Sequence, residues 1–168
     1  YNLKLFLFFI LSIVLLFSLY KFNYLPLLSS YYFIQAENAG LIREDFNDWS
    51  IFIVKALKVK QPWDAETAIA SADNLNKLHK REIIRNREDL IAASDLISSK
   101  LERLVTRYPD NALYAFWLGQ THLVMGERLD AKYFDQAESA LLRASQLSPA
   151  RQEIYFLLGR VYLNKKDF

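Results

Sequence analysis

The two histidines of this chain are candidates for metal binding or catalysis. A metal site or a catalytic triad needs partner residues at fixed spacing, and neither His79 nor His122 has one in the sequence. His79 lies in the charged stretch 77–87, where we expect a solvated side chain. His122 takes the position that Tyr162 holds forty residues later, which favours a packing role. The chain has no cysteine, so disulfides and thiolate ligands are excluded, and we expect no bound metal.

The acidic side chains offer a second route to chemistry, through general acid–base catalysis. Such catalysis needs two carboxyl groups in different environments. The pairs Glu44/Asp45 and Asp130/Asp135, together with Asp48, instead fall in predicted turns and at helix starts, where capping of backbone N–H groups explains acidic residues. The four glycines form no phosphate-binding loop. The sequence therefore predicts no catalytic residue and no cofactor.

The charge distribution argues against nucleic acid as a partner. Residues 1–28 carry only Lys4 and Lys21, whereas residues 29–168 carry 19 basic and 19 acidic side chains. The pI of 8.7 therefore comes largely from the two lysines near the start. No run of Lys or Arg resembles a nucleic-acid-binding arm. We expect neither DNA nor RNA to bind.

The longest apolar stretch of the chain lies near its start. From Leu5 to Tyr20 every residue is apolar or aromatic except Ser12 and Ser18. On an insertion scale this stretch favours a bilayer by roughly 4 to 8 kcal/mol. A cleaved signal peptide is the alternative, but no small-residue cleavage site follows. The sequence therefore predicts a transmembrane helix and membrane exit over residues 1–28, with membrane positions that include Leu5, Phe9, Ile13, Leu16 and Leu19.

Beyond the apolar stretch, turn signals divide the chain into amphipathic helices. Pro26 is expected to end the span, because proline cannot continue a helix without losing a hydrogen bond, and Ser29 or Ser30 can cap the next helix. Further turn signals occur at residues 40–45, 62, 85–89, 109–111, 126–130 and 148–149. No strand-like alternation competes with them. The predicted fold class is all-α.

A motif that recurs after forty residues is the most specific signal. The stretch 117–122, WLGQTH, returns at 157–162 as LLGRVY, and each glycine lies ten residues after a proline. Small residues at 137 and 144 precede the second proline. This pattern predicts helix–turn–helix units in which a glycine lets two helices approach closely. The residues that carry the signature are Gly119, Ala137, Ala144, Pro149 and Gly159.

These residues resemble the tetratricopeptide (TPR) repeat, in which small residues at the crossing of two antiparallel helices precede a closing proline. A TPR unit has about 34 residues, so the longer period needs an insertion, and residues 126–134 are the natural place for it, with Asp130 able to cap the second helix. The resemblance implies a TPR-like antiparallel helix-pair solenoid after the transmembrane helix. Its units would be a degenerate pair at 29–62, a longer pair at 63–108, a unit with an inserted turn at 109–149 and the first helix of a truncated unit at 150–168.

A solenoid of this kind presents a concave face that can hold a peptide or a partner protein. The positions that we expect to contact such a partner are Leu113, Phe116, Gln120, Val124, Phe156 and Arg160. The last helix is apolar on several sides, so we also expect it to need cover from a further helix, the natural chain to continue and the isolated soluble fragment to self-associate through this end. The apolar residues are Ile154, Tyr155, Phe156, Leu157, Leu158, Val161, Tyr162 and Leu163.

The order of the motifs also resembles the C-terminal part of membrane proteins of the O-antigen ligase or polymerase family that carry TPR tails. The resemblance rests on a last apolar span, YLPLL at 24–28, a helix with Ala36, KAL at 55–57, and degenerate TPR units with LD at 129–130 and YF at 133–134. In that family the multi-span part upstream transfers a glycan from a polyprenyl-diphosphate carrier, and no residue here matches its catalytic loop.

The resemblance implies a protein of the bacterial cytoplasmic membrane, with a lipid bilayer and a protein or peptide as partners and a polyprenyl-linked glycan as substrate of the parent protein. The lysines and arginines that flank the span are too evenly placed to assign the side of the membrane. The alternative is a complete single-pass membrane TPR adaptor for assembly of envelope proteins.

Overall fold

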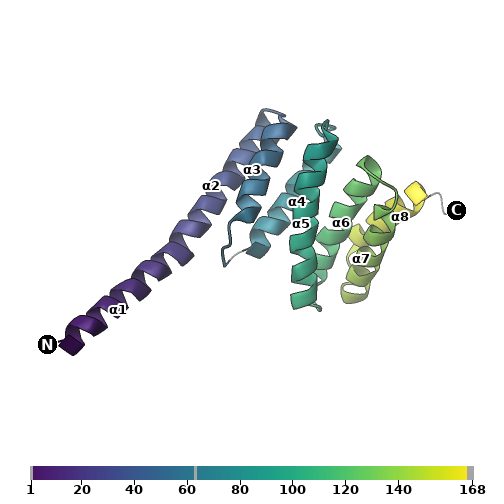
Figure 1. The fold of residues 1–168 in the computed structure, drawn as a ribbon. Helices are drawn as coiled ribbons and strands as arrows, with labels where there is room; N and C mark the ends of the chain where they lie inside the picture. Colours follow the sequence, from purple (N-terminus) through teal and green to yellow (C-terminus); the bar gives the residue numbers. More distant parts are fainter. Residues whose placement is uncertain (1, 63, 166–168) are drawn as a thin grey trace.

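The N-terminal region forms one long helix that leads into a stack of shorter helices (Figure 1). The computed structural model describes residues 2–62 and 64–165, and for residues 2–4 only the backbone. Within these residues every regular element is helical, which confirms the all-α fold class. The long helix is built from α1 (Asn2–Leu19), a π-helical turn η1 (Tyr20–Tyr24), α2 (Leu25–Glu37) and a second π-helical turn η2 (Asn38–Ile42).

The expectation that Pro26 ends the first helix is wrong. In a regular α-helix the proline ring collides with the carbonyl four residues earlier. Here the turn η1 widens the helix just before the proline, and the Leu25 N–H bonds to the Tyr20 carbonyl five residues back. The helix therefore continues through Pro26 as far as Ile42. Ser29 caps nothing; it is buried inside α2 and donates to the Ala56 carbonyl at 3.2 Å.

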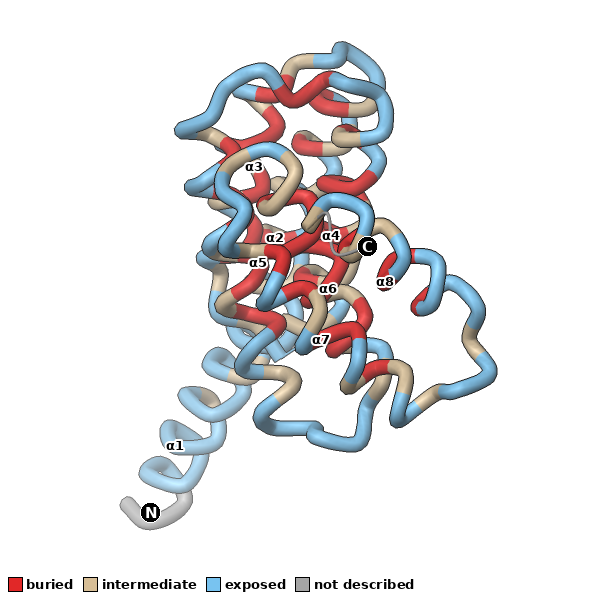
Figure 2. The backbone as a smooth tube through the Cα atoms, turned by 90° about the vertical axis from the view of Figure 1, so that its right-hand side faces the viewer, coloured by how far each residue is buried: buried red, intermediate tan, exposed pale blue. Residues whose placement is uncertain are grey.

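The apolar side chains of α1 point away from the rest of the molecule. Leu5 and Phe8 are 75% and 72% exposed, and the predicted membrane positions Phe9, Ile13, Leu16 and Leu19 are exposed as well. In the described part of the chain, the helix Leu5–Ile42 is long and apolar enough to cross a membrane, and none of its most apolar window is buried. Figure 2 shows the contrast between the exposed α1 and the buried segments of the other helices. A core helix of a soluble protein would bury these side chains instead.

The remaining helices pack side by side beyond α2 (Figure 1). They are α3 (Phe46–Lys58), α4 (Asp64–Lys80), α5 (Arg87–Arg107), α6 (Ala112–Arg128), α7 (Tyr133–Leu147) and α8 (Gln152–Lys165). We call this set, together with α2, the helical array. Each helix contacts its successor in the chain, and α4, α6 and α8 also meet as next-but-one neighbours, α4 with α6 and α6 with α8.

Two apolar clusters form the core of the array. The larger one extends over α2, α3, α4 and α5 and also takes in Leu118 and Val124 of α6 and Ala140 of α7. Its members Trp49, Leu75 and Ile97 are fully enclosed. The smaller one joins α6, α7 and α8 around Leu141 and Ile154. Side chains from α5 and α6, among them Trp117, pack against both clusters. The two clusters are therefore continuous, and α6 connects them.

Small residues allow α6 and α7 to pack closely. A Cβ atom on Gly119 would lie 2.6 Å from Leu141 Cγ, and one on Gly126 would lie 2.6 Å from the ring of Phe134. Ala137 and Ala144 on α7 are fully buried. Only glycine leaves room for the facing side chain at either position. The close approach that the motif predicts at Gly119 is therefore present.

Side-chain caps start three of the helices. Asp45, Asn86 and Asn111 each accept a hydrogen bond from a backbone N–H of the first turn of α3, α5 and α6. Asp130 acts slightly earlier than predicted: its carboxylate accepts from the Lys132 N–H at 3.0 Å in the turn before α7, and α7 itself has no side-chain cap. Helix α6 ends at Arg128 and α7 begins at Tyr133, so the turn between them occupies residues 129–132 and lies later in the chain than the predicted turn at 126–130.

Helix α8 is covered on one side only. Leu157 and Val161 are buried in the smaller cluster against α6 and α7, so for these two residues the expectation of missing cover is wrong, whereas Leu163 is exposed. A Cβ on Gly159 would meet nothing within 4 Å. Phe156 is 70% exposed and Tyr155 50%. The second copy of the motif therefore lies in a more open environment than the first.

Candidate functional site

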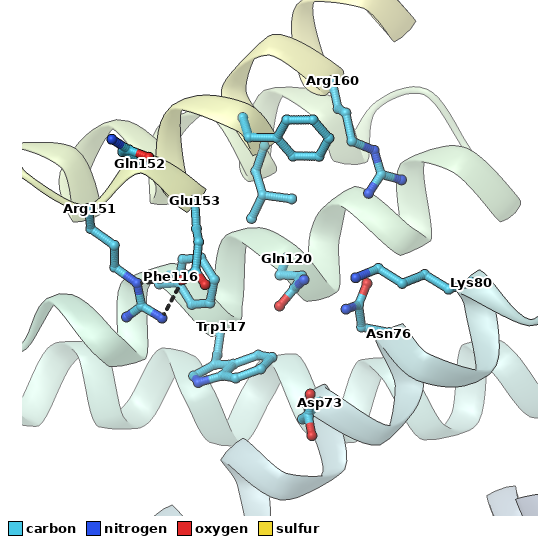
Figure 3. Close-up of a pocket in the computed structure, with 12 residues that line it drawn as sticks. Asp73, Asn76, Lys80, Phe116, Trp117, Gln120, Arg151, Gln152, Glu153 and Arg160 are labelled. Carbon is cyan, nitrogen blue, oxygen red and sulfur yellow. Dashed lines mark hydrogen bonds and ion pairs between the residues drawn. The ribbon is translucent and has the colours of Figure 1, made fainter. Parts of the chain in front are cut away.

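A groove of about 480 Å³ crosses the face of the array formed by α4, α6 and α8 (Figure 3). The three helices lie next to one another here because α6 packs against both α4 and α8. Asp73, Asn76 and Lys80 come from α4, and Phe116, Trp117 and Gln120 from α6. The α8 side supplies Arg151, Gln152, Glu153, Phe156, Leu157 and Arg160.

Aromatic rings form one wall of the groove. Phe116 and Trp117 meet edge to face with their centroids 5.2 Å apart. The Arg151 guanidinium lies 4.1 Å from the centroid of Phe116 and is also hydrogen-bonded to Glu153 at 2.9 Å. A cation above a ring in this way is attracted by the negative face of the π system. The contact between Arg151 and the Phe116 ring joins the start of α8 to α6. This wall of the groove therefore offers flat apolar surface edged by charge.

Buried amides lie deeper in the groove. Gln120 and Asn76 are 7% and 6% exposed, yet both line the groove. Figure 3 shows their side chains, with Lys80, pointing toward the middle of the groove. Gln120 Oε1 is buried and has no hydrogen-bond partner among the described residues. A buried acceptor of this kind typically costs about 1–3 kcal/mol when left unpaired. Gln120 thus borders the groove with an unpaired acceptor, which an N–H group of a ligand would satisfy after the amide rotates, because the oxygen itself is closed to solvent in this conformation.

An ionic cluster adjoins the groove through Arg160, which belongs to both. Glu127 on α6 accepts hydrogen bonds from Arg160 at 2.8 Å and 2.9 Å, from Asn164 at 3.2 Å and from His79 Nε2 at 2.6 Å. Burial alone raises the pKa of Glu127, but the hydrogen bond from His79 and the charge and hydrogen bonds of Arg160 outweigh it, and the net pKa is lowered. The cluster ties α4, α6 and α8 together.

His79 belongs to this cluster, so the expectation that it is solvated is wrong. Its side chain is 11% exposed. Arg128 Nε donates to His79 Nδ1 at 3.0 Å. Because arginine has donors only, Nδ1 must accept, and the proton donated to Glu127 is on Nε2. The residue lies next to α6 because α4 and α6 pack together, which its sequence surroundings did not reveal.

The other histidine is a packing residue, as its position in the repeat predicts. His122 is 5% exposed and stacks on Tyr133 with the centroids 6.3 Å apart. Burial lowers its pKa to about 4, against a smaller opposing contribution from the backbone of Gln136. Its Nε2 lies 4.0 Å from a carboxylate oxygen of Glu102. Among the described residues, no group of three or more His, Asp or Glu side chains has the arrangement of a metal site.

The structure brings together four of the six predicted contact residues. Phe116, Gln120, Phe156 and Arg160 all line the groove. Leu113 lies one turn before Phe116, in a separate and more open depression at the turn between α5 and α6. Val124 is 2% exposed and packs in the larger cluster, so the prediction that it contacts a partner is wrong.

The α4 side of the groove was not predicted. Asp73, Asn76 and Lys80 follow one another on a single helical face at spacings of three and four residues. That spacing was visible in the sequence, but nothing in it indicated that this face lies opposite α8.

Comparisons of the chain with protein-family models, with curated proteins and with solved structures found no match.

Proposed function

We propose that this chain is a membrane-tethered interaction module of the TPR type, and that the groove between α4, α6 and α8 holds an extended segment of a partner protein. The unpartnered Gln120 Oε1 is the observation that carries the proposal. A peptide backbone supplies N–H donors for such an acceptor, and its side chains can rest on Phe116, Trp117 and Phe156. The described residues that line the groove include no arrangement of nucleophile, base and oxyanion donors, which favours binding over catalysis.

The TPR assignment is supported by the way that neighbouring helices pack. Gly119 on α6 faces Leu141 and Ala137 on α7, which is the close crossing that the repeat motif requires. The groove lies on the face where α4, α6 and α8 meet, and these would be the first helices of successive pairs. In a solenoid of helix pairs the first helices line the concave surface.

Site-specific photocrosslinking tests the groove. A photoreactive phenylalanine analogue placed at Phe156 should crosslink to one partner in native membranes, whereas the same analogue at Tyr155 should not. The two positions are adjacent and both exposed, but only Phe156 lines the groove. Equal labelling of the same partner from both positions would argue against the groove.

A Gln120→Leu variant separates binding from folding. Leucine removes the unpaired acceptor, so the fold should keep its stability or gain some, whereas crosslinking from Phe156 should fall. Loss of one satisfied hydrogen bond at about 1–3 kcal/mol corresponds to a fivefold to 150-fold weaker complex. A Gln120→Leu variant that is stable and still captures its partner fully would disprove the role of this amide.

The tether is proposed from the exposed apolar surface of α1, which only lipid or another apolar phase can cover. The intact chain should require lipid or detergent, and a chain that lacks residues 1–25 should remain in solution. Sedimentation in the absence of detergent distinguishes the two. If the intact chain behaves as a soluble monomer, the membrane proposal is wrong.

We further propose that the module is the C-terminal tail of a membrane glycan ligase or polymerase of the bacterial cytoplasmic membrane that acts on polyprenyl-linked glycan. The support is the order of the span, the YLPLL stretch at 24–28 and the degenerate repeats. The upstream reading frame tests it. Several further spans and a catalytic loop would support the ligase, whereas a start codon just before Tyr1 would favour the single-pass adaptor.

A further inference from the structure

A second groove begins where the long helix leaves its apolar stretch. It has a volume of about 930 Å³ and is lined by η1, the end of α3, the α3–α4 connection, the start of α4, the second half of α5 and the start of α6. Lys21 and Phe22 belong to it at one side, and Arg107 and Tyr108 at another. The groove thus connects the long helix to a part of the array that is more than eighty residues away in sequence.

Positive charge is concentrated in this groove. Residues 29–168 are balanced overall, with 19 basic and 19 acidic side chains. Two acidic side chains, Asp64 and Glu66, line the groove. Six basic side chains line it as well: Lys21, Lys58, Lys60, Lys100, Arg103 and Arg107. A neutral array therefore carries a local excess of positive charge on the side that adjoins the apolar helix.

Only one of these cations is neutralised inside the groove. Lys100 is 9% exposed, and its Nζ lies 2.8 Å from Asp64 Oδ2. In the part of the chain that the structure describes, the ion pairs include none of the other five basic residues of the groove. Like charges gathered in this way repel one another, and an anionic surface would offset that repulsion.

The position of Lys21 indicates which surface that is. It directly follows the apolar stretch Leu5–Tyr20, so in a bilayer its ammonium reaches the headgroup level. Figure 1 shows the end of α3 and the turn between α5 and α6 at the lower side of the array. The N-terminal end of α1 extends away from the array on this same side. A basic groove that shares Lys21 with the membrane boundary is therefore placed at the level of the lipid phosphates.

We propose that this groove docks onto the anionic phospholipid headgroups of the bilayer that α1 spans, and so fixes the orientation of the helical array relative to the membrane. The inference rests on the membrane tether proposed above. Attraction of a Lys or Arg to an anionic leaflet changes a binding equilibrium by about fivefold per side chain and fades within a Debye length of about 8–10 Å. Docking should therefore depend on lipid charge and on salt.

The absence of cysteine makes a direct measurement possible. The full chain with Thr106→Cys, an exposed position on α5 between Arg103 and Arg107, carries a fluorophore and is reconstituted into vesicles with headgroup-nitroxide lipid as quencher. We expect stronger quenching in vesicles that contain phosphatidylglycerol than in pure phosphatidylcholine, and loss of the difference at 0.5 M salt, a concentration that shortens the Debye length to roughly 4 Å. A fluorophore at Glu88→Cys, at the opposite end of α5, should report no such difference.

Charge-removing variants complete the test. Arg103→Ala with Arg107→Ala should shift the equilibrium away from the docked state by roughly 25-fold, or about fivefold for each cation. Arg85→Ala with Lys132→Ala removes the same charge from exposed positions outside the groove and should leave the quenching unchanged.

Flotation of the vesicles separates this inference from the tether itself. A chain that fails to float with either lipid overturns the tether and the docking together. A chain that floats with both lipids but shows equal quenching at Thr106→Cys overturns the docking alone, and reassigns the groove to a soluble acidic partner.

Discussion

Helices α6 and α8 carry the same motif forty residues apart but lie in different surroundings. In α6 the glycine faces α7, and a Cβ there would be 2.6 Å from Leu141 Cγ. In α8 the corresponding Gly159 has open space around it. The leucines of the two motifs are buried in both helices, Leu118 in α6 and Leu157 and Leu158 in α8. The comparison shows that a small residue in a repeat is a packing requirement only where a second helix actually crosses it.

Leucine at each glycine should give the largest difference between the two helices. Gly119→Leu places four carbons where even the first is too close to Leu141, so we expect a loss of about 3 kcal/mol in the free energy of unfolding. In Gly159→Leu the added Cβ meets nothing within 4 Å, and a poor helix former is replaced by a good one, so we expect a gain of up to about 1 kcal/mol. Urea unfolding of the full chain in detergent, followed by helical circular dichroism, measures both.

Alanine provides a matched control with a smaller side chain. Gly119→Ala should destabilise and Gly159→Ala should stabilise, although the chemical change is identical. Ala144→Leu, at a fully buried position of α7, should behave like Gly119→Leu. If both glycine substitutions moved the urea midpoint in the same direction, the difference in packing between α6 and α8 would be disproved.

The difference between α6 and α8 also explains how far the sequence could be used. The motif, the proline spacing and the run of apolar residues from Leu5 to Tyr20 are local features, and they predicted the apolar helix, the helical fold and the close approach at Gly119. The prediction that Pro26 ends the helix failed because a π-helical turn before the proline makes room for its ring. That turn is a backbone feature, a hydrogen bond from the Leu25 N–H to the Tyr20 carbonyl, and residue types do not reveal it. Leu157 and Val161 misled because their cover comes from α6 and α7, not from residues that follow them.

The candidate site was predictable on one side only. Phe116 and Gln120 share a face of one helix, and Phe156 and Arg160 hold the same register in the next copy of the motif, so periodicity alone selected them. The contribution of α4 depends on which helices meet across the array, and no repeat of the motif marks that helix. The second groove, at the end of the apolar stretch, required the same information, since Lys21 and Arg107 are brought together only by the tertiary fold.

The burial of His122 on α6 should make the stability of the fold depend on pH. His122 has an ordinary pKa of 6.5 when the chain is unfolded and a pKa of about 4 when it is buried in the fold. Between these values the unfolded chain binds more protons than the folded one, so the free energy of unfolding falls as the pH is lowered. Between pH 7 and pH 5 we expect a loss of about 2 kcal/mol.

The His122→Gln variant isolates this contribution. Glutamine does not titrate, so the difference in free energy of unfolding between the variant and the natural chain should change over this pH range by about 2 kcal/mol. Parallel pH profiles for the natural chain and His122→Gln would contradict the burial of this imidazole.

The smallest expected effect concerns the starts of the same two helices. Asn111 precedes α6, and its side-chain oxygen accepts a hydrogen bond from the Leu113 N–H at 3.0 Å. Arg151 occupies the same register before α8, and a guanidinium has no acceptor to offer. Asn111→Ala should therefore cost about 1 kcal/mol, whereas Asn111→Ser, which keeps an acceptor, should cost only a few tenths. Thermal unfolding of the full chain in detergent resolves the two, and equal losses for Ala and Ser would mean that the amide of Asn111 does not cap α6.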